Sequence, residues 1–124
     1  MKEEQLQLAV CDYIRLRYPD VLFNSDMSGI KLTMGQAIKA KRMRSSRGFP
    51  DLVIYANRKG RHGLFLELKA EGTKLTKKDG SFKSEHIEEQ AEMLVKLWRL
   101  GFKADFAIGF EDAKQQIDDY LKEV

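Results

Sequence analysis

The sequence predicts a single α/β domain over residues 1–124, in which helices flank a mixed β-sheet. Helical and strand patterns alternate in the order helix, strand, loop, two strands, helix, strand, helix. With 124 residues, 43% of them hydrophobic, the chain is long enough to bury one core without covalent staples. One domain is expected because no repeat, low-complexity segment or linker divides it.

The first third of the chain predicts one long helix and two short elements. Apolar residues recur at helical spacing over residues 3–18, and Pro19 ends that run because proline cannot continue a helix. A short strand begins at Leu22 and is interrupted by Gly29. Residues 35–43 indicate a short basic helix.

Two apolar runs in the middle of the chain, residues 51–56 and 63–69, predict neighbouring strands. Residues 57–61 have the asparagine and glycine chemistry of a hairpin turn, so we expect the strands to pair antiparallel. This pairing would bring Asp51 and Lys69 to the same open end of the sheet.

A third helix follows, with Ser84 as N-cap and Gly101 just past its end. Gln90 lies on the border of its apolar stripe, where an ordinary solvent-edge glutamine is the simpler interpretation. The stripe, in which Trp98 is expected to be a core residue, comprises Ile87, Ala91, Leu94, Val95 and Trp98.

The chain closes with a strand over residues 104–110 and a helix for which Asp112 is the expected N-cap. The apolar side of this helix comprises Ala113, Ile117, Tyr120 and Leu121.

The most informative pattern places Pro50-Asp51 before one central strand and Glu67-Leu68-Lys69 at the end of the next. Glu67 and Lys69 share one face because side chains alternate along a strand. Asp51 can face Glu67 across the pair, and two adjacent carboxylates repel each other unless a cation lies between them. A lone Glu-x-Lys is roughly nine times in ten solvated surface. Here, however, the charges interrupt apolar strands, which favours a site.

This arrangement of side chains predicts a phosphodiesterase centre. Oxygen ligands at a sheet edge suit Mg²⁺ or Mn²⁺, which keep several waters and are completed by substrate phosphate. Such an ion lowers the pKa of a bound water and offsets charge in the transition state. Lys69 is placed to orient or deprotonate the attacking water.

Pro50-Asp51 and Glu67-Leu68-Lys69 together make the chain resemble the VRR-NUC (virus-type replication-repair nuclease) branch of the PD-(D/E)xK nucleases, from about Glu3 to Asp112. The resemblance implies a restriction-endonuclease-like αβββαβ core. It also implies that the Leu68 carbonyl joins the two carboxylates in holding magnesium.

Family members also carry an acidic residue on the first helix and a glutamine on the helix after the Glu-x-Lys strand. Glu4 and Gln90 match these places. Glu3 is the alternative acid, and Glu4 is preferred because Gln7 then matches the family's glutamine three residues further on.

The net charge is only +3, but basic residues crowd two segments on either side of the motif. Phosphate neutralisation is the main source of affinity for DNA, so both segments are predicted DNA-backbone contacts. For any single residue, a solvated charged loop is about equally expected. The segments comprise Lys39, Lys41, Arg42, Arg44 and Arg47, and then Lys74, Lys77, Lys78 and Lys83.

The sequence also argues against several other classes of protein. The single cysteine, Cys11, excludes an internal disulfide, and with only His62 and His86 it cannot complete a Cys/His zinc site. No Walker-type glycine loop is present, so no nucleotide cofactor is expected. Without a signal peptide or an apolar run of membrane-span length, the protein is expected in the cytoplasm of a bacterial or phage-infected cell.

The predicted function is therefore metal-dependent DNA endonuclease activity. Stand-alone members of the branch are phage or mobile-element nucleases, some of them dimers that act on Holliday junctions. The resemblance thus implies a homodimer acting on branched DNA in replication, recombination or repair. A sequence-specific restriction-like or nicking endonuclease is the alternative within this chemistry, and a catalytically idle DNA-binding module is the alternative outside it.

Overall fold

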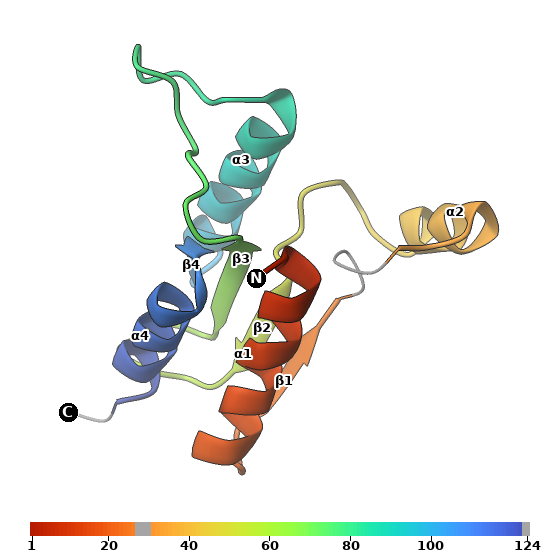
Figure 1. Ribbon diagram of the computed structural model, residues 1–124. Coiled ribbons are helices and arrows are strands. Elements are labelled where there is room, and N and C mark those ends of the chain that lie inside the picture. The colour runs from red at the N-terminus through yellow and green to blue at the C-terminus, as the bar shows by residue number, and fades with distance from the viewer. Residues whose placement is uncertain (27–30, 123–124) are drawn as a thin grey trace.

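A computed structural model of the chain describes residues 1–26 and 31–122 (Figure 1). The described elements are α1 (Glu3–Arg17), β1 (Leu22–Ser25), α2 (Met34–Arg42), β2 (Leu52–Tyr55), β3 (Leu64–Lys69), α3 (Glu85–Arg99), β4 (Lys103–Ile108) and α4 (Phe110–Leu121). The sheet has the order β1-β2-β3-β4, in which β2 is antiparallel to both β1 and β3, and β4 is parallel to β3. The predicted mixed sheet flanked by helices is confirmed, with α2 inserted after β1.

The main core lies on the face of the sheet that α1 and α4 cover. Leu64, Leu66 and Leu68 of β3 point into it and are almost fully buried. The alternation of a strand therefore places the intervening Glu67 and Lys69 on the opposite face, toward α3. The predicted apolar side of the last helix is also confirmed, since Ala113, Ile117, Tyr120 and Leu121 are all buried here.

A tight turn fixes the register of the β2–β3 hairpin. Lys59 and Gly60 have φ values of 52° and 77°, and Arg58 and Arg61 exchange backbone hydrogen bonds around them. Positive φ at both central residues matches the right-handed twist of the flanking strands. In the resulting register Leu52 pairs with Leu66, so Asp51 comes next to Glu67.

Helix α3 presents a different face to the sheet from the predicted one. Ser84 is its N-cap, as expected, and accepts a hydrogen bond from the Ile87 N–H. The buried positions are Gln90, Met93, Leu94 and Leu97. Val95 and Trp98 are instead 48% and 44% exposed.

The position of Gln90 explains why α3 presents a different face from the predicted one. Positions 90, 93, 94 and 97 form one continuous helical stripe, which turns Gln90 toward the sheet and Trp98 away from it. Trp98 packs under the Arg61 guanidinium, 3.6 Å from the ring centroid, so its ring is covered by a cation rather than by the core.

Two boundaries also differ from the sequence prediction. Strand β4 ends at Ile108, and α4 begins at Phe110 with Gly109 (φ 86°) as its N-cap. Asp112 is therefore inside the first turn, where its carboxylate accepts a hydrogen bond of 2.8 Å from the Ile108 N–H. The expected interruption at Gly29 lies outside the described residues.

The two basic segments adopt different structures. Helix α2 stands away from the sheet and has no buried residue (Figure 1). Residues 71–83 form a projecting hairpin arm in which Thr76 and Phe82 are bridged. The Lys83 N–H donates to the Leu75 carbonyl across this arm at 2.9 Å. Among the described residues, no helix is both long and apolar enough to cross a membrane.

Candidate active site

A cavity of about 170 Å³ opens at the end of β3, between α1, α3 and the segment that precedes β2. It contains the acidic, basic and amide side chains that the sequence motif predicted, together with others. Its lining comprises Glu3, Gln7, Arg44, Gly48, Phe49, Asp51, Glu67, Lys69, His86 and Gln90.

Asp51 is held at the start of β2 by the backbone of the neighbouring strand. Its Oδ2 accepts a hydrogen bond of 2.8 Å from the Leu68 N–H, and the residue is only 8% exposed. Gly48 allows the segment before β2 to lie close to α3, because its φ is 85° and a Cβ there would lie 3.1 Å from the Glu89 carbonyl oxygen. The segment before β2 is therefore pressed against α3.

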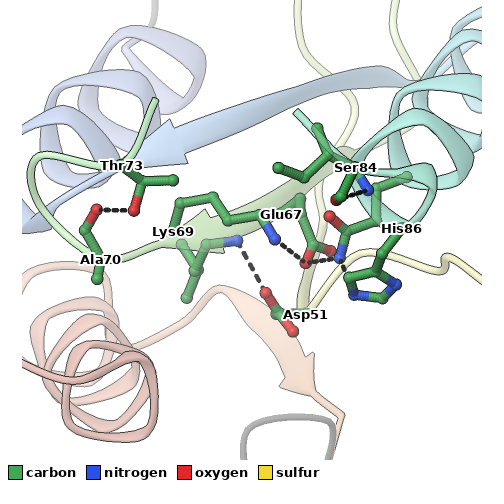
Figure 2. Close-up of polar contacts among 10 residues, drawn as sticks. Asp51, Glu67, Lys69, Ala70, Thr73, Ser84 and His86 are labelled. Carbon is green, nitrogen blue, oxygen red and sulfur yellow. Dashed lines mark hydrogen bonds and ion pairs between the residues drawn. The ribbon is translucent and has the colours of Figure 1, made fainter. Parts of the chain in front are cut away.

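Glu67 and Lys69 lie next to Asp51 on the face of β3 that points toward α3, and all three side chains converge in Figure 2. Glu67 is 3% exposed and Lys69 is 6% exposed. The Lys69 Nζ lies 4.0 Å from Glu67 Oε1. Glu67 Oε2, in contrast, has no hydrogen-bond partner among the described residues. One carboxylate oxygen is therefore buried with its acceptor capacity unused.

Burial, and next to it the negative charge of Asp51, raises the pKa of Glu67 to about 9, although the Lys69 ammonium partly offsets both effects. A carboxyl group so perturbed by desolvation and by a like charge is typical of a functional site. Without a metal ion, the ionised form of this carboxyl group is strongly disfavoured even beside the Lys69 ammonium.

Gln90 completes this arrangement from α3. Its side chain is 5% exposed, and its Nε2 donates a 2.7 Å hydrogen bond to Glu67 Oε1. The sequence placed Gln90 on the border of an apolar stripe, whereas the structure places it inside the stripe and against the acid. The simpler interpretation of a solvent-edge glutamine is therefore wrong.

On α1 the two candidate acids differ in whether they line the cavity. Glu3 lines the cavity, and Glu4 is absent from its lining. Glu3 and Gln7 are four residues apart and share one helix face, and both line the cavity. Gln7 donates from Nε2 to the Ser25 hydroxyl and the Asp26 carbonyl, which ties this helix face to the end of β1.

His86 is the lining residue that sequence reasoning missed. It lies in the first turn of α3, and its Nε2 is 3.1 Å from Gln90 Nε2. A signal was present, because residues 86 and 90 are one helical turn apart. Until the orientation of α3 was known, however, this spacing could not be distinguished from a pair of surface residues.

No protein-family model and no curated protein matches the chain. A solved structure described as "VRR_NUC domain protein" matches with a TM-score of 0.70 and 24% sequence identity, over 98% of this chain and 88% of that one. The chain has the fold of a VRR_NUC domain. The VRR-NUC-like fold, and the αβββαβ core that the resemblance implied, are confirmed.

Within this VRR_NUC fold, the donor atoms fit a hard divalent cation. Asp51 and Glu67 supply adjacent carboxylates, one of which has an unused buried oxygen. No group of three or more His, Cys, Asp or Glu side chains among the described residues could hold a metal ion by itself. Two carboxylates completed by a backbone carbonyl, water and substrate oxygens match Mg²⁺, which keeps several waters.

The basic residues divide between the cavity and its surroundings. Of the predicted DNA contacts, Arg44 lines the cavity itself. Lys41 and Arg47 join Arg44 around an adjacent hollow. The remaining residues lie on the exposed surface of α2 or of the hairpin arm, and comprise Lys39, Arg42, Lys74, Lys77, Lys78 and Lys83.

Proposed function

We propose that this protein is a metal-dependent endodeoxyribonuclease that hydrolyses phosphodiester bonds of DNA. The observation that carries the proposal is the buried Glu67 carboxyl group, which has one oxygen without a partner among the described residues, faces a second carboxylate and lies 4.0 Å from an ammonium. Such a group is costly to the folded protein unless a cation compensates for it. The VRR_NUC fold supports the same function.

In this proposal Asp51 and Glu67, with the Leu68 carbonyl, hold Mg²⁺, for which Mn²⁺ can substitute. The ion would supply a bound water of lowered pKa and would stabilise negative charge on the phosphate. The Leu68 N–H fixes the Asp51 carboxylate through its 2.8 Å hydrogen bond. Gln90 fixes the Glu67 carboxylate in the same way at 2.7 Å.

Lys69 is the residue proposed to position or activate the attacking water. Its Nζ is held 4.0 Å from Glu67 Oε1 inside the cavity, so the ammonium is in place to orient the oxygen of a bound water. As the water oxygen bonds to phosphorus, the bond from phosphorus to the leaving oxygen breaks; the proton lost by the attacking water passes to solvent, and the leaving oxygen takes up a proton from solvent. Glu3 at the mouth of the cavity is the proposed first-helix acid, in place of Glu4.

DNA is the proposed partner, bound by the basic segments on either side of the cavity. Arg44 reaches the cavity, and the lysines of the hairpin arm are exposed to solvent. Changing Arg42, Arg44 and Arg47 together to alanine should weaken DNA binding and flatten its salt dependence, by roughly one unit of slope for each phosphate that is no longer neutralised. A second triple variant changes Lys74, Lys77 and Lys78 of the arm and tests the other basic segment in the same way. An unchanged salt slope in both triple variants would place the DNA surface elsewhere.

We further propose that the substrate is branched DNA, such as a Holliday junction, and that the enzyme is a homodimer of a phage or mobile element. One chain offers one candidate centre, and symmetric cleavage of two strands requires two centres. The motif resemblance supports this narrower proposal, whereas the fold supports only a nuclease.

The deciding experiment incubates the protein with junction, flap, nicked, single-stranded and linear duplex DNA in Mg²⁺, in Mn²⁺ and in chelator. We expect metal-dependent cleavage, with junction DNA cut well ahead of linear duplex by a protein that sediments as a dimer. A monomer that cuts linear duplex at one base sequence would instead be a restriction-like or nicking endonuclease. Tight binding without cleavage in either metal would show an idle DNA-binding module.

A further inference from the structure

We infer that His86 is a positioning residue that sets the orientation of the Gln90 amide and, through it, the orientation of Glu67. The inference rests on the proposed function, because it assigns His86 a part in preparing the metal centre. His86, Gln90 and Glu67 are joined in series by contacts of 3.1 Å and 2.7 Å, as Figure 2 shows around the labelled His86 and Glu67.

The hydrogen atoms of this chain of contacts can be accounted for completely. The Gln90 Nε2 carries two hydrogens and accepts none. One hydrogen is donated to Glu67 Oε1. The other points at His86 Nε2, which must then be the unprotonated nitrogen of the ring. The ring proton of a neutral His86 is consequently on Nδ1.

The opposite orientation of the amide makes a different and testable set of contacts. Gln90 Oε1, which is buried without a partner among the described residues, would then face the Glu67 carboxylate. Two acceptor oxygens would meet, and His86 would have to donate from Nε2 instead. The two orientations therefore require opposite tautomers of His86.

The observed orientation has a consequence for the metal centre. Because one amide hydrogen of Gln90 is donated to Glu67 Oε1, the other oxygen of that carboxylate keeps its lone pairs for a cation. His86 contacts the Gln90 amide and acts on the carboxylate through it. Outer hydrogen-bond partners of this kind orient ligands and commonly change metal affinity by roughly 10- to 100-fold.

The tautomer is measured directly by ¹⁵N NMR of the metal-free protein at about pH 10, above the ordinary histidine pKa of about 6.5 and above the raised pKa of Glu67, so that the carboxylate is ionised. The chain has only two histidines, so His62, which packs against Phe102, serves as the internal reference. We expect Nε2 of His86 to be unprotonated, and Gln90→Leu to remove this preference. Protonated Nε2 in the wild-type protein would overturn the inference.

The functional part is tested by calorimetric titration of Mn²⁺ without DNA, comparing His86→Leu with His86→Gln. The glutamine can accept the same hydrogen bond, whereas leucine cannot. We expect His86→Leu to weaken Mn²⁺ binding by roughly tenfold and His86→Gln to retain it. In the double variant with Gln90→Leu, the two effects should not add, since both break one series of contacts.

Wild-type affinity in His86→Leu would overturn the inference, as would equally weakened binding in both His86 variants with unchanged thermal unfolding midpoints. If the wild-type protein itself bound no Mn²⁺ and cut no DNA, the proposed function would fail. The tautomer measurement would still decide whether His86 orients Gln90, so the two failures are distinguishable.

Discussion

Glu67 and Asp118 are both carboxylates that receive hydrogen bonds from a neighbouring helix, yet their pKa values are shifted in opposite directions. Burial opposes ionisation of Asp118, but hydroxyl donors from Tyr13 and Tyr18, at 2.5 and 2.6 Å, outweigh it and lower its pKa. Glu67 is buried more deeply and faces Asp51, so its pKa is raised.

The difference separates a structural polar cluster from a functional one. Asp118 of α4 is supplied with donors from α1 and its C-cap, and the cluster ties these two helices together. Glu67 has one oxygen with no partner among the described residues. The half-buried Asp118 carboxylate receives two donors at Oδ1, which stabilises its charge, whereas the buried Glu67 carboxyl group lacks such donors at one oxygen and is a candidate for binding a cation.

Neutralising each carboxylate in turn should give the largest difference between the two sites. We expect Glu67→Gln and Asp51→Asn each to reduce cleavage by about 100-fold or more, beyond the roughly 10- to 100-fold typical of outer-shell changes. Asp118→Asn should leave cleavage unchanged. Single-turnover assays on junction DNA in Mg²⁺ measure this contrast. Near wild-type cleavage by both Glu67→Gln and Asp51→Asn would show that the centre lies elsewhere.

Changing Lys69 separates binding of the metal ion from catalysis. Lys69→Ala should lower the turnover by roughly 100-fold, the scale of a missing proton-transfer group, because no other described cation lies within salt-bridge distance of Glu67. Mn²⁺ binding should be retained, since the carboxylates remain. Parallel cleavage assays and calorimetry test this, and disappearance of both properties together would make Lys69 a support of the metal site only.

The metal-free protein should lose stability as the pH rises. Glu67 has a folded pKa of about 9 against an ordinary value of 4.5. Its neutral form therefore contributes stability that is fully present below about 4.5 and is lost as the pH rises toward 9. Urea unfolding in chelator should show this alkaline loss in the wild type but not in Glu67→Gln. An identical pH profile in the two proteins would contradict the assigned shift.

Asp118 should show the opposite and smaller dependence. Because its folded pKa is lowered, its contribution is present above the ordinary value of 3.8 and is lost as the pH falls through the folded value. At neutral pH, Asp118→Asn should cost about 1 kcal/mol, the difference between hydrogen bonds to a charged and to a neutral acceptor. The stability gap from the wild type should close in acid, and a gap that widened there would refute this assignment.

Local sequence signals predicted the elements that build the site. The hairpin chemistry of residues 57–61 set the pairing that puts Asp51 beside Glu67, and strand alternation separated Glu67 from the leucines on either side of it. The antiparallel pairing and the inward-facing leucines were confirmed because each depends on neighbours in the chain.

Prediction from the sequence was less successful where tertiary packing decides which face of a helix is buried. The buried face of α3 was misjudged because apolar residues surround Trp98 in sequence, while the contact between Gln90 and Glu67 turns that ring outward. The choice between Glu3 and Glu4 depended on the rotation of α1 about its axis, which adjacent acids in a sequence do not reveal.

The measurement that tests the central claim most directly is calorimetric titration of Mn²⁺ into the wild-type protein and Glu67→Gln, without DNA, in buffers of different ionisation enthalpy. Binding of the ion must displace the proton that the raised pKa of Glu67 retains. We predict one site in the wild type with proton release, and greatly weakened binding without that release in Glu67→Gln. Equal Mn²⁺ binding by the two proteins, or none by the wild type, would contradict the assignment of Asp51 and Glu67 as a metal centre.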